Sequence, residues 1–154
     1  MTDLFSRHRA LLERAVTALH ERSYWTPYPE VPSSKNYGET AKADGEAAFA
    51  ALKGQLFQLT GHPESSRRGA EVSPFGPELG ITYPACEPAP LIAAAKNAAP
   101  ALAAAGIESR VGVCLEILHR LNRMSFLIGH ATQHTTGQAF AMAFQAGGPH
   151  AQDR

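Results

Sequence analysis

Two histidines, His130 and His134, stand in the sequence HATQH, and their i, i+4 spacing would place both side chains on one helix face. Zinc-binding helices use this spacing, but a zinc hydrolase carries a glutamate directly after its first histidine, where this chain has Ala131. The histidines left to supply a third ligand, His119 and His150, are distant. We therefore predict no metal site and keep His130 and His134 as its only candidates. Our preferred interpretation is a helix end, where charged imidazoles suit the helix dipole.

The two cysteines, Cys86 and Cys114, are the other side chains with nucleophilic potential. A nucleophilic thiol needs a cationic or helix-N-terminal setting, whereas Cys114 lies between apolar neighbours and is predicted to be a small core residue. Cys86 stands just before a predicted helix, which is a better electrostatic position, but no base can be assigned to it. We predict structural roles for both cysteines.

Other motifs that carry chemistry are missing from the sequence. It contains no GxGxxG, no GxxxxGK[ST], no GxSxG and no paired carboxylates at catalytic spacing. The glycines of the segment 147–150 (GGPH) follow a predicted helix and do not join a strand to one, so they form a turn and not a phosphate cradle. We predict no catalytic residue and no cofactor-binding residue in this chain.

Composition limits the classes of partner. The 154 residues carry a formal net charge of zero, which gives no basic footprint for nucleic acid or an anionic membrane surface. No apolar run reaches the roughly 18 residues of a membrane span. The two cysteines lack the spacing of a zinc site or a disulfide framework. These features predict a cytoplasmic protein of the size of one domain. They also predict that it binds neither nucleic acid nor membranes.

The first half of the chain is predicted to be two helices separated by a loop. Residues 3–22 form a helix with Asp3 as N-cap, and residues 39–53 form a second helix that stops at Gly54. Prolines and aromatic residues in 23–37 rule out a regular helix and predict an ordered loop that covers an apolar surface. Residues 55–60 have the composition of a strand, and 61–70 read as a polar loop. The inward face of the first helix is predicted to carry Leu4, Phe5, His8, Leu11, Leu12, Ala15 and Leu19.

The second half is predicted to be a β-hairpin followed by helices. Residues 71–73 and 79–83 form the hairpin strands around a Pro/Gly turn, and a hairpin this small needs a partner surface. The Ala-rich helix 88–105 should end or kink at Pro100 and lie flat on a sheet or other helices. One long helix is expected over 109–135. Its apolar stripe comprises Val111, Cys114, Leu115, Leu118, Leu121 and Ile128, widened by Val113, Ile117, Met124 and Leu127.

Gly137 should break that long helix, with a further helix from Gln138. The fold class that results is α+β, mainly helical with a small β-hairpin. The stripe of 111–128 is too wide for the remaining elements to cover.

Several segments carry a family resemblance. The hairpin, Ala-rich helix and amphipathic helix from Glu71 onward resemble the start of the aldehyde dehydrogenase superfamily, an α/β fold. Within it, the chain resembles the phenylacetic acid degradation (PaaN) branch. The matching segments are SYWTPYPEVPS, YGETAKADGEAAFAAL, EVSPFGPELGITYP, RVGVCLEILHRLN and HTTGQAFAMAFQAGGPHAQDR. The likeness departs at His134-Thr135-Thr136-Gly137-Gln138, which replaces the family's acidic and basic turn residues.

The resemblance implies an NAD(P)-dependent aldehyde dehydrogenase with a cysteine nucleophile, a glutamate base and a Gly-rich phosphate turn. None of these has a counterpart in residues 1–154, so Cys86 and Cys114 are not the nucleophile. The chain is expected to be an N-terminal fragment, inactive alone, with NAD or NADP bound by the complete protein. Residues 1–70 would be a helical extension and 71–154 the start of the nucleotide-binding domain.

Two hypotheses on function stand side by side. In the first, the fragment's exposed apolar helices pack on the remainder of its own polypeptide or on another copy. The alternative is a stand-alone helical interaction module without catalysis.

Overall fold

The structure, a computed structural model, describes residues 3–61 and 63–150. Its described part is mainly helical with one antiparallel strand pair, which confirms the predicted α+β class. The elements in chain order are α1 (Leu4–Glu21), α2 (Ser34–Tyr37), α3 (Ala41–Leu52), β1 (Ser66–Arg68), β2 (Tyr83–Ala85), α4 (Pro88–Ala104), α5 (Gly106–Arg123), α6 (Ser125–Thr136) and α7 (Phe140–Gly147).

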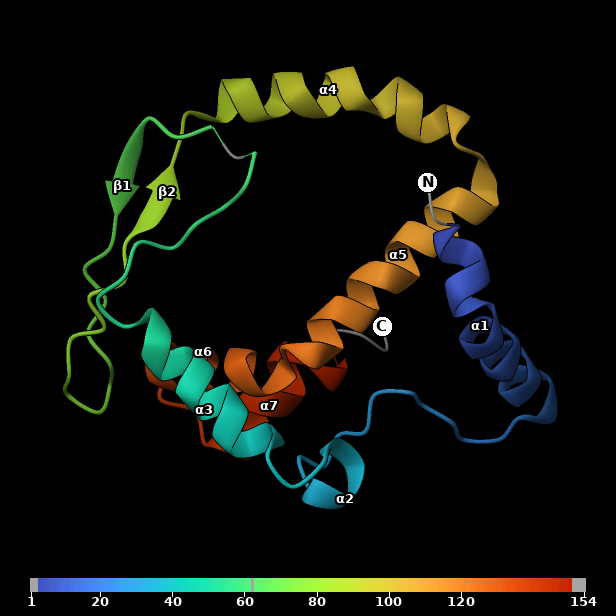
Figure 1. Ribbon diagram of the computed structural model, residues 1–154, viewed down its shortest axis with the longest axis horizontal. Helices are drawn as coiled ribbons and strands as arrows, with labels where there is room; N and C mark the ends of the chain where they lie inside the picture. Colours follow the sequence, from blue (N-terminus) through green and yellow to red (C-terminus); the bar gives the residue numbers. More distant parts are fainter. Residues whose placement is uncertain (1–2, 62, 151–154) are drawn as a thin grey trace.

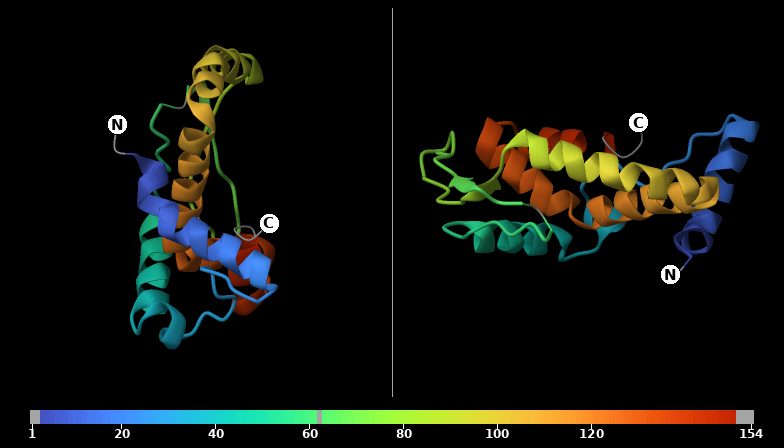
Figure 2. Two further views of the ribbon diagram at one scale, coloured as in Figure 1. Left: turned by 90° about the vertical axis from the view of Figure 1, so that its right-hand side faces the viewer. Right: turned by 90° about the horizontal axis from the view of Figure 1, so that it is seen from above.

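These elements form an open frame (Figure 1). Helix α4 runs along the top of the view from the strand pair to the start of α5, and α5 returns diagonally to a group formed by α3, α6 and α7. Helix α1 packs against α5, which Figure 2 shows from a second direction. Residues 1–70 therefore supply helices that pack on helices of 71–154, while the division into two domains at that point stays a prediction. Among the described residues, no helix is both long enough and apolar enough to cross a membrane.

Helix α1 begins as predicted. The carboxylate of Asp3 accepts a hydrogen bond from the backbone N–H of Phe5 at 3.1 Å and another from the hydroxyl of Ser6. The predicted inward face is confirmed for six of its seven residues, since His8 is buried and Leu4, Phe5, Leu11, Leu12 and Ala15 are half-buried, while the Leu19 side chain is 77% exposed. The predicted inward position of Leu19 is wrong, and the buried residue at this end of the helix is Ala18.

Helices α3, α6 and α7 enclose the best-packed region of the chain. Phe144 of α7 is fully buried, and its ring lies 4.9 Å from that of Phe126 on α6. Tyr37 of α2 meets both rings edge-on, as the predicted covering role of the 23–37 loop requires. The sequence did not predict α2 itself. Gly45 of α3 touches the backbone of α6 at Phe126 so closely that a side chain has no room there.

The long helix expected over 109–135 is two helices. Helix α5 ends at Arg123 and α6 begins at Ser125, because Met124 leaves the helical region with φ −101° and ψ 2°. The N–H of Met124 donates to the carbonyl of Leu121 at 2.9 Å, a tightened last turn that closes α5. The break allows α6 to turn toward α3. The predicted end at Gly137 is confirmed, since this residue caps α6 with φ 78°.

The strand predictions for 55–85 are largely wrong. The segment 61–70, expected to be a loop, contains β1, whose Arg67 pairs with Pro84 of β2. Residues 55–60 form only an isolated parallel bridge from Leu56 to Thr82. The expected hairpin is present as a chain reversal with a single bridge between Val72 and Glu78. Alternation over so few residues does not decide which neighbour a strand pairs with.

A small core forms where the reversal meets α3. Phe49, Leu79 and Ile81 are buried together, and Leu52, Phe57, Tyr83 and Ala131 pack around them. The partner surface that the small hairpin was expected to need is therefore supplied by α3 and α6.

Helix α4 is covered by no other element of the described chain. None of its residues is buried, so the expectation that it lies flat on a sheet or on other helices is wrong for these residues. The helix does not end at Pro100 but continues to Ala104, in agreement with the predicted range 88–105. Pro88 occupies the first turn as predicted, where a missing N–H costs little.

Candidate functional site

The two candidate metal ligands lie on α6 but have separate surroundings. The His130 imidazole is buried and its ring centroid lies 4.5 Å from that of Phe140. The Nδ1 atom of His134 shares a hydrogen bond of 3.0 Å with the hydroxyl of Ser73, and its ring stacks on Phe49 at 5.0 Å. Each histidine therefore joins α6 to a neighbouring element. Within residues 3–61 and 63–150, no three His, Cys, Asp or Glu side chains gather closely enough to hold a metal ion.

The surroundings of His130 and His134 favour the neutral form of both side chains. Burial lowers the pKa of His130 below its ordinary value, and the nearby His134 and Lys42 act in the same direction. Burial, followed by the charge of Lys53, also lowers the pKa of His134. Both shifts favour the neutral imidazole. They argue against the predicted role as cations that complement the helix dipole.

Neither cysteine forms part of a reactive arrangement. Cys114, predicted to be a core residue, is exposed on α5, because α1 packs against the side of α5 that carries Gly112 and Glu116. Cys86 is half-buried just before α4. Both thiols are free, and no ion pair or hydrogen bond joins a base to either of them among the contacts of the described residues.

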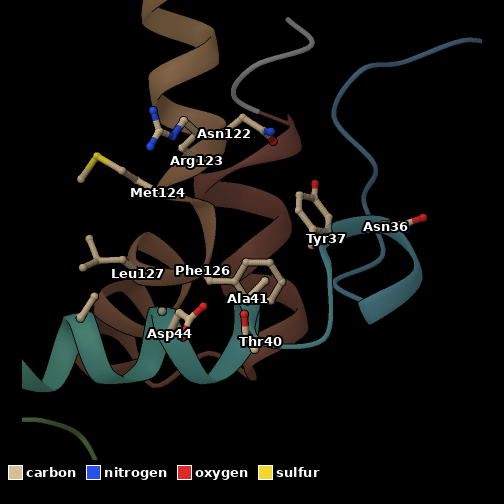
Figure 3. A pocket seen from close by; sticks show the side chains of 12 residues that line it. Asn36, Tyr37, Thr40, Ala41, Asp44, Asn122, Arg123, Met124, Phe126 and Leu127 are labelled. Atoms are coloured by element: carbon tan, nitrogen blue, oxygen red, sulfur yellow. The ribbon is translucent and has the colours of Figure 1, made fainter.

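A cavity of about 590 Å³ opens where α2, α3 and the α5–α6 junction meet (Figure 3). Asp44 of α3 lies on one side of it, and Asn122 and Arg123 of α5 lie on the other. The rings of Tyr37 and Phe126 form an apolar wall between them. The amide oxygen of Asn122 is buried without a hydrogen-bond partner. The lining therefore combines charged, hydrogen-bonding and apolar groups.

A second, apolar cavity of about 300 Å³ lies beside the small core. Leu79 and Ile81 of the chain reversal form one wall, and Leu127, Ile128 and Ala131 of α6 form the other. Such a surface fits an apolar side chain of a covering segment.

The most strongly perturbed acid was missed by sequence reasoning. Glu116 of α5 is buried against α1, where its carboxylate accepts hydrogen bonds from Arg120 at 2.8 Å and Arg7 at 3.2 Å. It also contacts the ring of His8 at 2.8 Å. Arg120, then His8 and Arg7, lower the pKa of Glu116 to about 2. The signal available in the sequence was a charged residue within the apolar stripe of 111–128, four positions before an arginine.

The junction between β2 and α4 does not fit the pyrophosphate of a dinucleotide cofactor. A pyrophosphate binds where free backbone N–H groups open a helix directly after a strand, and β2 to α4 is the connection of this type within the described ranges. Its first turn contains Pro88 and Pro90, which have no N–H to donate, and the preceding Glu87 carries negative charge. This junction would repel a phosphate.

Comparison with known proteins identifies a relative of known fold. No family model and no curated protein sequence matches the chain. A crystal structure of an NAD-dependent aldehyde dehydrogenase from Burkholderia multivorans is 53% identical, with a TM-score of 0.87. The similarity covers 97% of this chain and 27% of that chain. The chain thus has the fold of an aldehyde dehydrogenase segment, and the identity supports the aldehyde dehydrogenase superfamily.

Proposed function

We propose that this chain is the helical scaffold segment of an NAD-dependent aldehyde dehydrogenase of aromatic degradation, and that it is inactive alone. The observation that carries the proposal is 53% identity over 97% of the chain to an enzyme of which the chain spans only 27%. The nucleophile, the base and the cofactor turn would come from the remainder of the enzyme.

Exposed apolar side chains support a covering partner. Leu91, Ile92 and Leu102 of α4 are each between 39% and 54% exposed, and Ile107 of α5 is 70% exposed. Burying this surface would yield about 25 cal/mol per Å² of apolar area. We propose that the remainder of the same polypeptide covers α4, since the related enzyme has far more chain than the matched segment.

The proposal also covers the substrate, the cofactor and the cellular compartment of the complete enzyme. We propose an aldehyde that arises in phenylacetate breakdown, supported by the sequence segments that resemble the phenylacetic acid degradation branch. NAD is the proposed cofactor, because the related crystal structure is described as NAD-dependent. Two free thiols are in keeping with a reducing compartment such as the cytoplasm.

Fragment complementation tests the proposal. The purified chain is mixed with the Burkholderia enzyme from which the matched segment has been deleted, and NADH formation is followed by absorbance with phenylacetaldehyde and with aliphatic aldehydes. We expect no NADH from either fragment alone, activity from the mixture, and faster turnover of the aromatic aldehyde. The substitution Ile92→Lys should reduce the restored activity at least about tenfold, because a buried lysine without a partner is costly.

A matched control separates docking from folding. Ala50→Lys places the same charge on an exposed position of α3 and should leave complementation unchanged. Turnover by the isolated chain would contradict the proposal, as would a mixture that stays inactive while both fragments are folded.

A further inference from the structure

A third cavity, of about 510 Å³, lies between α1 and α5 and is lined by cations. Its walls are formed by Arg7, Glu116, His119, Arg120, Arg123 and Met124. We propose that this cavity binds a phosphate group, either free or at the end of a small phosphorylated metabolite. The inference rests on these side chains alone and does not depend on the proposed aldehyde dehydrogenase role.

Glu116 fixes two guanidinium groups at the cavity wall. Its Oε1 accepts from Nε of Arg120, while its Oε2 accepts from Nη1 of Arg7. A guanidinium has five N–H donors, so each arginine keeps further donors for a ligand. The carboxylate is held by both arginines and His8, and it acts as the anchor that orients them and not as a competing ligand.

Arg123 adds a cation that the protein leaves unneutralised. It follows Arg120 by three residues on α5, which places both on neighbouring helix positions. Among the ion pairs of the described residues, none involves Arg123. The lining therefore carries an excess of two positive charges before any charge on His119 is counted.

Charge and shape together select the ligand class. A cation would be repelled by this lining, and a neutral ligand would leave the charge of Arg123 unmatched. The planar guanidinium group of arginine can donate two parallel N–H···O hydrogen bonds to two oxygens of one phosphate. The side chains of Arg7 and Arg120 are 47% and 72% exposed, so an anion can reach them from solvent. A multiply charged phosphate fits best.

Calorimetric titration of the 154-residue chain at low salt tests the assignment. We expect saturable one-site binding of pyrophosphate and weaker binding of inorganic phosphate, both weakened as NaCl screens the charges. Arg123→Gln should raise the Kd for pyrophosphate about tenfold, since it removes one charge-assisted contact. Arg123→Lys keeps the charge without the fork and should give an intermediate Kd.

The control variant is Arg110→Gln, which removes the same charge from an exposed position of α5 outside the cavity. It should change the Kd by less than about twofold, as expected for a screened charge at a distance. Urea unfolding should be the same for Arg123→Gln and wild type. The proposal is overturned if pyrophosphate does not bind saturably, if Arg110→Gln weakens binding as much as Arg123→Gln, or if citrate binds as tightly as pyrophosphate.

Discussion

Glu116 shows how a single residue can join two distant parts of the chain. Its carboxylate lies in the contact between α1 and α5. Its partners Arg7 and His8 precede it by more than a hundred residues in the sequence. An isolated buried carboxylate would be protonated to avoid the cost of desolvation. Here the hydrogen bonds to the charged form prevail, and the pKa of Glu116 falls to about 2.

This lowered pKa makes the α1–α5 contact sensitive to acid. A carboxyl group with a folded pKa near 2 and an ordinary value of 4.5 stabilises the folded chain above pH 4.5. That contribution is lost as the pH falls from 4.5 toward 2. We expect Glu116→Gln to lower the urea midpoint at pH 7 and to show a shallower decline of that midpoint in this window.

Urea unfolding followed by circular dichroism at pH 7, 4 and 2.5 measures the effect. Asp3 also has a lowered pKa, caused first by its hydrogen bond with Ser6, so the wild-type decline has a second source on α1. The difference between wild type and Glu116→Gln isolates Glu116. Glu13→Gln is the matched control, because Glu13 forms only an exposed pair with Arg9 at 3.8 Å. Equal midpoints for the Glu116→Gln and Glu13→Gln variants would contradict the role assigned to Glu116.

At the scale of elements, small residues set how closely the helices approach. A Cβ added at Gly112 of α5 would lie 2.5 Å from the backbone nitrogen of Phe5 on α1. Backbone atoms cannot move aside as a flexible side chain can, so α1 itself would have to shift. Glu116 lies one helical turn after Gly112. The contact between α1 and α5 that brings Glu116 to its partners therefore depends on glycine, which has no side chain, at position 112.

Gly112→Ala tests this close approach. Alanine favours an isolated helix over glycine by about 1 kcal/mol, but overpacking a helix contact costs about 1–3 kcal/mol. We expect a net loss of stability of up to about 2 kcal/mol and faster hydrogen exchange confined to α1 amides. Cys114→Ala, at an exposed position two residues later, should leave both measurements unchanged. A Gly112→Ala variant that is more stable than wild type would show that α1 does not pack this closely.

The same elements explain what the sequence could and could not predict. The N-cap at Asp3, the proline at the start of α4 and the glycine end of α6 depend on neighbours in the sequence, and all three were predicted. The break at Met124 depends on α6 packing against α3, which no local pattern encodes. The charge network of Glu116 likewise needs α1 beside α5. In the candidate site, the environment of His134 comes from Ser73 and Phe49, two segments that join it only in the fold.

At the scale of the whole molecule, the packing is uneven. The group of α3, α6 and α7 has fully buried aromatic residues, whereas α4 has no buried residue along its whole length. In proteins, most of the stability of a helix comes from tertiary packing of one face and not from its intrinsic propensity. In the open frame of Figure 1, α4 therefore stands apart from the packed group of α3, α6 and α7.

This asymmetry predicts the behaviour of the isolated chain. Exposed Leu91, Ile92 and Leu102 should bind a hydrophobic dye and drive self-association at high concentration, as large exposed apolar patches do. The backbone amides of α4 should be among the fastest in the chain to exchange hydrogen, while those of α6 are protected.

The double substitution Ile92→Lys with Leu102→Lys should remove most of the dye signal and shift sedimentation toward the monomer. Two lysines at Ala47 and Ala50 of α3, which are also exposed, serve as the charge-matched control. A stand-alone module would instead melt cooperatively without dye binding, and that result in the wild-type chain would favour the interaction-module hypothesis over the scaffold segment.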